Sequence, residues 1–140
     1  MQSEDCLFCK IVRGEIPCAK VYETEEVLAF LDIAPAAPGH VVLVPKAHYP
    51  TLLEVPEDLG RALLGAVKQV GRAAMAALSA TGFNVAVNTF ESAGQVVFHA
   101  HIHVIPRQSG DGLSPWAGKP YDSNETMARL AASIRSRIAL

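Results

Sequence analysis

Three of the five histidines in this chain of 140 residues fall within five positions, at His99, His101 and His103. Apolar residues stand between and after them, an alternation typical of a strand with two different faces. On such a strand the three imidazoles line one face, roughly 7 Å apart, and the apolar residues face the core. Burying three neighbouring imidazoles is costly unless polar groups meet them. The run therefore predicts a functional strand, placed at residues 96–105.

Two kinds of chemistry fit this run of histidines. In the first, a neutral imidazole attacks phosphorus with its unprotonated ring nitrogen, and its neighbours bind phosphate oxygens and protonate the leaving group. In the second, the imidazoles are ligands of a catalytic zinc ion, as in zinc hydrolases with a His-x-His pair on a strand. A third alternative is a nucleotide-binding module without catalysis. The spacing of the histidines alone does not separate these alternatives.

The rest of the chain predicts an α+β fold with an antiparallel sheet and one long helix. The helix is expected over residues 56–80, where Pro56 and two acidic residues suit the first turn, and Gly82 is expected to stop it. A shorter C-terminal helix is expected after a helix-start box of Asp122 and Glu125. A helical turn is expected at residues 6–12, and the other strands at residues 21–22, 27–31, 41–44 and 83–88.

Length and composition predict one domain over residues 1–140, with a core at about 4–107 and a C-terminal tail and helix at 108–140. The net charge is -2 and Lys and Arg form no basic run, so we expect no nucleic-acid partner. The chain has no long apolar stretch and no signal-type N-terminus, which predicts a cytoplasmic protein without membrane contact. Three cysteines indicate no disulfide framework.

The residues around the histidines resemble the signature of the histidine-triad (HIT) family, His-φ-His-φ-His-φ-φ with φ apolar, preceded here by Gly94-Gln95. The resemblance covers most of the chain up to Arg107 and points to the bacterial zinc-containing type, similar to HINT-like purine nucleoside phosphoramidases and dinucleoside polyphosphate hydrolases. It implies a HIT-like fold of about five antiparallel strands, one long helix and a shorter C-terminal helix, usually assembled as a homodimer. Other matching segments are CLFCKI at 6–11, FLDIAP at 30–35, GHV at 39–41 and PKAH at 45–48.

The resemblance implies a nucleotide hydrolase or nucleotidyl transferase that acts at the α-phosphate of a nucleoside 5′-phosphoramidate or a dinucleoside polyphosphate. His101 would form a covalent nucleotidyl-histidine that water cleaves, and a backbone carbonyl would fix its tautomer. His103 would contact phosphate oxygens. Gln95, exposed by its place in the pattern, would position the leaving group and the water. No organic cofactor is implied, and the third histidine favours the hydrolase branches over the uridylyltransferase-like branch.

The same resemblance implies a pocket for a purine nucleotide. Asp32 would accept hydrogen bonds from the ribose hydroxyls, and Phe30 and Ile33 would form apolar walls around the base. Val96 stands where many relatives carry Ser or Thr, so a hydroxyl contact to phosphate is absent and the leaving-group preference stays open. The expected nucleotide-binding residues are Phe30, Asp32, Ile33, His40, Asn88, Gly94, Gln95, Val96, His101 and His103.

A structural zinc ion is also implied by the resemblance, because two thiolates and two imidazoles make a closed tetrahedral site. His99 would then serve the metal and leave the other two histidines of the run for the phosphate. Cys18 has no partner in this set and is expected to be buried filler. Trp116 resembles C-terminal segments that reach toward a partner's active site. The expected zinc ligands are Cys6, Cys9, His48 and His99.

Overall fold

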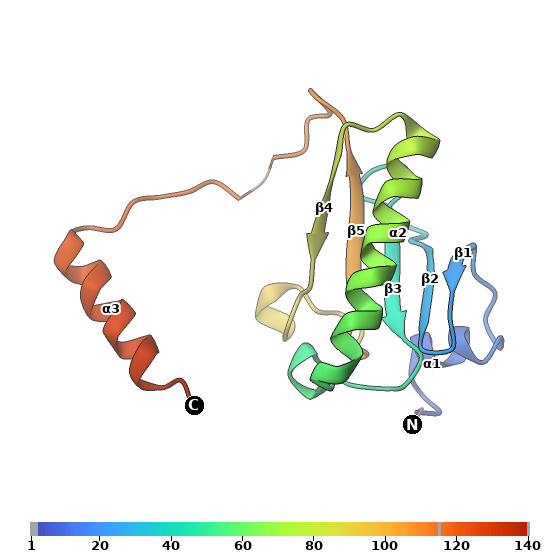
Figure 1. Ribbon diagram of the computed structural model, residues 1–140, viewed down its shortest axis with the longest axis horizontal. Helices are drawn as coiled ribbons and strands as arrows, with labels where there is room; N and C mark the ends of the chain where they lie inside the picture. The colour runs from blue at the N-terminus through green and yellow to red at the C-terminus, as the bar shows by residue number, and fades with distance from the viewer. Residues whose placement is uncertain (1–2, 115, 140) are drawn as a thin grey trace.

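A five-stranded antiparallel sheet forms the centre of the computed structural model, which describes residues 3–114 and 116–139 (Figure 1). The strand order is β1-β2-β3-β5-β4, and each neighbouring pair is antiparallel. This arrangement confirms the predicted α+β class. The strands are β1 (Lys20–Glu23), β2 (Val27–Leu31), β3 (Val41–Pro45), β4 (Gly82–Ala86) and β5 (Ile102–Arg107).

One long helix, α2 (Gly60–Leu78), lies across one face of the sheet (Figure 1). Its residues Leu63, Val67 and Val70 are buried against β2, β3 and β5, so the apolar stripe of this helix is core. The other helices are α1 (Leu7–Val12) and α3 (Asn124–Ser136), and short 3-10 turns lie at Leu52–Glu54, Glu57–Leu59 and Glu91–Ala93. Among residues 3–114 and 116–139, no helix combines the length and hydropathy needed to cross a bilayer.

The predicted helix boundaries need correction. Regular helix in α2 begins at Gly60, because a 3-10 turn occupies the preceding residues. The helix ends at Ser79, whose left-handed φ of 53° closes the last turn, and Gly82 is already the first residue of β4. At α3 the cap is not the Asp122 box: Oγ of Ser123 accepts a hydrogen bond of 3.1 Å from the backbone N–H of Thr126.

The histidine strand is shorter than the alternation predicted, because β5 begins only at Ile102. The pairing of β5 with its neighbour β3 stops at Ile102, opposite Leu43, although β3 itself continues to Pro45 beside β2. The backbone before β5 finds other partners: the N–H of Ala100 donates to the carbonyl of Tyr49 at 2.7 Å. His99 and His101 precede β5, so their side chains need not point to the same face as that of His103. The predicted fourth strand likewise ends at Ala86.

Candidate active site and metal cluster

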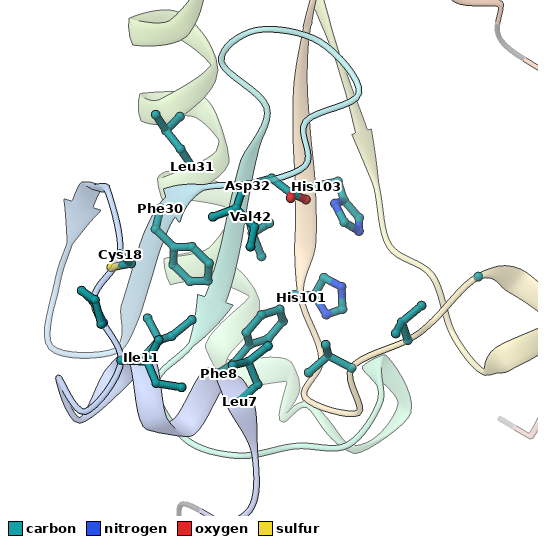
Figure 2. A pocket seen from close by; sticks show the side chains of 16 residues that line it. Leu7, Phe8, Ile11, Cys18, Phe30, Leu31, Asp32, Val42, His101 and His103 are labelled. Atoms are coloured by element: carbon teal, nitrogen blue, oxygen red, sulfur yellow. The ribbon is translucent and has the colours of Figure 1, made fainter.

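A cavity of about 380 Å³ opens beside the start of β5. Figure 2 shows His101 and His103 on one side of it, with Phe8 and Phe30 among the apolar side chains on the other. The wall is mostly apolar and carries few polar groups, the usual composition of a small-molecule site. Seven of the residues expected to bind a nucleotide line this cavity: Phe30, Asp32, Ile33, Gly94, Val96, His101 and His103.

His101 is held in one tautomer by the backbone. Its Nδ1 lies 2.7 Å from the carbonyl oxygen of His99, and a carbonyl only accepts, so Nδ1 carries the proton. Burial lowers the pKa of His101, which keeps the ring neutral at pH 7. The other ring nitrogen, Nε2, therefore carries a lone pair. The ring of Phe8 meets His101 edge-on, with centroids 5.0 Å apart, and supports its orientation.

His103 is oriented by His40, which lies behind it. The backbone N–H of Ala36 donates to Nδ1 of His40 at 3.0 Å, so the proton of the neutral His40 ring is on Nε2. That Nε2–H donates to Nδ1 of His103 at 2.9 Å, which leaves the proton of His103 on its Nε2. Burial, with smaller effects from His101 and His40, lowers the pKa of His103 to about 4. His103 is thus a neutral hydrogen-bond donor beside the lone pair of His101.

Asp32 follows β2 and carries the cavity's carboxylate. Its Oδ1 accepts a hydrogen bond of 2.8 Å from the N–H of Ala34, an Asx turn that holds the side chain. Its Oδ2 is 3.7 Å from Nε2 of His40. The single proton on that nitrogen goes to His103, at the shorter distance of 2.9 Å. Oδ2 therefore keeps acceptor capacity that a ligand hydroxyl can use.

The position of Gln95 in the pattern predicted an exposed side chain. In the structure, however, Gln95 is buried and only 2% accessible. Its Oε1 accepts from the N–H of Phe90 at 2.9 Å, and its Nε2 donates to the carbonyls of Pro50 at 2.8 Å and Val97 at 3.1 Å. The carboxamide of Gln95 is thus hydrogen-bonded to three backbone groups. Gln95 braces the loop in front of the cavity, and its side chain is not in the cavity wall.

Gly94 and Asn88 meet at the same loop. Gly94 has a φ of 100°, a conformation that favours glycine, and a Cβ there would lie 3.4 Å from Nδ2 of Asn88. Asn88 itself stands behind the glycine and does not line the cavity. Val96, two residues on, is exposed and lines the cavity. The loop therefore presents backbone and an apolar side chain to the site, with Asn88 as support.

The four expected zinc ligands come together in one cluster. Nε2 of His99 donates to the carbonyl of Pro45 at 2.7 Å, and burial lowers the pKa of His99 to about 4, so Nδ1 carries a lone pair. This Nδ1 lies 3.4 Å from Sγ of Cys6, 3.5 Å from Sγ of Cys9 and 3.3 Å from Nδ1 of His48.

These separations match a tetrahedral site. With zinc about 2.3 Å from sulfur and about 2.0–2.1 Å from nitrogen, tetrahedral ligands lie about 3.6 Å apart for sulfur–nitrogen and about 3.3 Å for two nitrogens. A third sulfur–nitrogen pair, Sγ of Cys9 and Nδ1 of His48, is 3.4 Å apart. The donor set and its geometry therefore fit Zn²⁺ with all four positions taken by protein, as in structural sites.

Sequence reasoning missed part of the cavity wall. Leu7, Phe8 and Ile11 reach the cavity from α1, and their helical spacing around the two cysteines was the available signal. Cys18 was expected to be buried filler, but it is half-buried and lines the cavity. The N-terminal segment therefore does more than carry two metal ligands. It builds one wall of the pocket.

Comparison with known proteins agrees with this geometry. The HIT domain family matches residues 13–110. The adenosine 5'-monophosphoramidase hnt1 of Schizosaccharomyces pombe is 39% identical over 135 residues, which cover 95% of this chain and 98% of that protein. Adenylylsulfatase HINT3 of Arabidopsis thaliana is 46% identical over 115 residues, which cover 82% of this chain. The chain spans only 57% of the length of the Arabidopsis protein.

Solved structures show the same fold. A member of the HIT family of proteins from Bacillus subtilis is 40% identical, with a TM-score of 0.89 over 98% of this chain and 99% of that one. A Zn-bound histidine triad family protein from Mycobacterium smegmatis is 36% identical, with a TM-score of 0.77 over 98% of this chain and 100% of that one. The signature histidines, the sheet order and these matches lead to one assignment: the chain belongs to the HIT family.

Proposed function

We propose that this protein hydrolyses a nucleoside 5′-phosphoramidate or a dinucleoside polyphosphate at the α-phosphate, through a covalent nucleotidyl group on His101. One observation carries the proposal. In a mostly apolar cavity the lone pair of His101 Nε2 stands next to the N–H of His103, with ring centroids 4.9 Å apart. This arrangement supports His101 as the nucleophile and His103 as the donor for phosphate oxygens, each in the required tautomer.

The reaction needs two displacements at phosphorus. In the first, Nε2 of His101 forms a bond to phosphorus and the P–N bond of a phosphoramidate breaks. The leaving amine keeps the electron pair and takes a proton from solvent. In the second, water adds to phosphorus, the P–Nε2 bond breaks, and the electron pair returns to the imidazole while the water loses a proton. The Nε2–H of His103 stabilises the phosphate oxygens in both steps.

The rest of the cavity suits a purine nucleoside. Its volume of about 380 Å³ lies within the usual range for ligand sites. Oδ2 of Asp32 is the acceptor for the ribose hydroxyls, and Phe30 and Ile33 line the space for the base. In the loop that forms the cradle for the phosphate, the backbone N–H of Val96 is the donor, because those of Gly94 and Gln95 already donate to the carbonyls of Glu91 and Phe90. The yeast relative named as an adenosine 5'-monophosphoramidase supports an adenine nucleotide conjugate as the substrate class.

Three expected site residues act indirectly in this proposal, because their side chains do not line the cavity. His40 fixes the tautomer of His103 through the hydrogen bond of 2.9 Å. Gln95 and Asn88 hold the loop that presents the phosphate cradle. They are positioning residues, and their substitution is expected to change the shape of the site more than its chemistry.

A structural zinc ion at Cys6, Cys9, His48 and His99 forms part of the proposal. The ion would tie α1 to the sheet and so hold the α1 wall of the cavity against the histidines. In the alternative, the histidine run binds a catalytic zinc ion, which would require ring nitrogens of His101 and His103 to point at the metal. His101 donates its Nδ1 proton to a carbonyl and His103 accepts from His40, so neither nitrogen is directed at the cluster.

We also propose that the protein is a cytoplasmic homodimer that assembles through the long helix and the free edge of the sheet. β4 is an outer strand, and Val85 on it and Leu64 on α2 are exposed apolar side chains. Apolar residues at a sheet edge favour pairing with a second copy. The mass of the protein in solution, measured by light scattering, distinguishes one chain from two.

The catalytic proposal is tested by trapping the intermediate. The protein is mixed with adenosine 5′-phosphoramidate, quenched within one turnover, digested and analysed by mass spectrometry. An adenylyl group on the peptide at His101 is expected, and His101→Asn should abolish both the adduct and turnover. Diadenosine polyphosphates and guanosine phosphoramidate, tested in parallel, identify the leaving group and the base. Unchanged turnover in the variant contradicts the proposal, and loss of activity on chelation with the fold intact favours the catalytic zinc alternative.

A further inference from the structure

A groove runs along α2 on the side of β1, away from the catalytic cavity. It encloses about 470 Å³ between the sheet residues Val21 and Leu31 and a row of small residues on α2, Ala73, Ala74 and Ala77. Val21 and Leu31 are 48% and 37% exposed although both are large and apolar. Small side chains on a helix let a second helix approach closely, so this groove has the form of a helix-docking surface.

The architecture of the sheet explains why the groove is open. Five strands spaced about 4.8 Å apart place the outer strands about 19 Å from each other, whereas one helix with its side chains is about 10–12 Å wide. α2 packs mainly over β2, β3 and β5, which contribute the buried residues of the core beneath it. Val21 on the outer strand β1 and Leu31 at the end of β2 are left exposed on the helix side. The layer of helices over the sheet is incomplete there.

α3 has no packing partner within the described part of the chain. None of its residues is buried, and Figure 1 shows it standing apart from the sheet, at the end of a long segment that follows β5. Its large apolar side chains Met127, Leu130 and Ile134 nevertheless form one stripe with spacings of three and four residues, and Ile138, just after the helix, continues this spacing. An isolated helix of this length is marginal in water, so α3 needs a tertiary partner to be stable.

The segment between β5 and α3 leads away from the groove of its own chain. Leu113 and Trp116 lie against Ile105 and Arg107 of β5, which point to the face of the sheet opposite the buried Val104. The segment therefore leaves on the face away from α2, and Figure 1 shows it passing β4, the outer strand farthest from β1. The groove of the same chain lies on the other face and at the other edge.

We propose that the apolar stripe of α3 docks into the groove between α2 and β1 of a second copy of this chain. The exchange would complete the helix layer of each copy over β1 and bury both sets of exposed apolar side chains. It does not depend on the proposed reaction, because neither the stripe nor the groove contains a residue of the catalytic cavity or of the metal cluster other than Leu31, whose side chain lies at their common border.

Crosslinking between two singly substituted chains tests the exchange. Ala73→Cys in the groove and Ile134→Cys in the stripe are made separately in a Cys18→Ser background, mixed, allowed to exchange subunits and treated with a short bismaleimide. A product of twice the chain mass, with the two substituted peptides joined, is expected. The matched control replaces Ile134→Cys by Ala132→Cys, which lies on the opposite face of α3. Joining no stronger than in this control overturns the proposal.

The same pair placed in one chain separates the two possible grooves. A crosslink that leaves the double variant at the mass of a single chain, with none between the mixed single variants, shows that α3 binds its own groove and overturns the exchange. Hydrogen exchange gives an independent measure. Amides of α3 should exchange at least about tenfold more slowly in the wild type than in Leu130→Asp, with Ala132→Asp unaffected. Fast exchange of α3 in the wild type contradicts docking.

Discussion

The backbone carbonyl of His99 accepts a hydrogen bond of 2.7 Å from Nδ1 of His101, and the imidazole of the same His99 belongs to the metal cluster. One residue thus holds the proposed nucleophile with its backbone and would hold the proposed zinc ion with its side chain. The ring of Phe8, on the helix that carries the two cysteines, also packs on His101. Loss of the metal should therefore disturb the site from two directions without removing any atom of the reaction.

Cys9→Ser is expected to lower the bound zinc from about one ion per chain to almost none. The melting temperature should fall by about 10 °C, which corresponds to roughly 3 kcal/mol for a chain of this size. The value of kcat should fall because α1 no longer holds Phe8 against His101. Metal content by elemental analysis, calorimetry and initial rates measure the three effects. Cys18→Ser is the matched control, since this thiol is outside the cluster, and it should keep its zinc. Full stability of Cys9→Ser without metal would contradict a structural role.

His40→Ala is expected to reduce kcat by roughly 10–100-fold with a smaller change in KM, because the tautomer of His103 is no longer fixed. Nitrogen chemical shifts of the imidazoles report the tautomers directly. In the wild type, Nε2 of both His40 and His103 and Nδ1 of His101 should carry the proton. His40→Gln keeps a donor near the same place and should restore part of the rate. A mixed His103 tautomer in the wild type would overturn this arrangement.

His103 should make stability depend on pH in a defined window. Its pKa is lowered to about 4 in the folded protein and is about 6.5 when unfolded, so the unfolded chain binds more protons between these values. The free energy of unfolding should therefore rise with pH from about 4 to about 6.5 and then level off. Urea unfolding at several pH values measures this slope. In His103→Gln the slope should be shallower, and an equal slope would show that His103 is not responsible.

Val96→Thr should increase kcat/KM by about tenfold or more, because a hydroxyl hydrogen bond to a charged phosphate is worth about 1.5 kcal/mol or more. The side chain is exposed at the cavity, so the substitution should not alter packing. Steady-state kinetics with phosphoramidates that differ in the leaving amine measure the gain. Val96→Ala, which shortens the side chain without adding a donor, is the control. If both variants behave alike, the side chain at this position does not reach the phosphate.

Local sequence was enough for some features of this protein. The HIT signature, the four metal ligands and the α+β class follow from residues whose spacing repeats that of a family or of a secondary structure. The seven expected cavity residues also come together as the resemblance implied. These features depend on neighbouring positions in the chain, or on motifs in which the chemistry restricts the residue type.

The division of the histidine run was decided by tertiary structure. Alternation predicted one strand over residues 96–105, but pairing with β3 stops at Ile102, and the N–H of Ala100 donates to Tyr49 instead. Gln95 was expected at the substrate and is instead bound to three backbone groups, one of them on Pro50. The wall from α1 and the place of Cys18 were missed for the same reason. Pattern alone could indicate the histidines that we propose to react. Which backbone partners orient them depends on segments distant in sequence, and only folding brings those segments together.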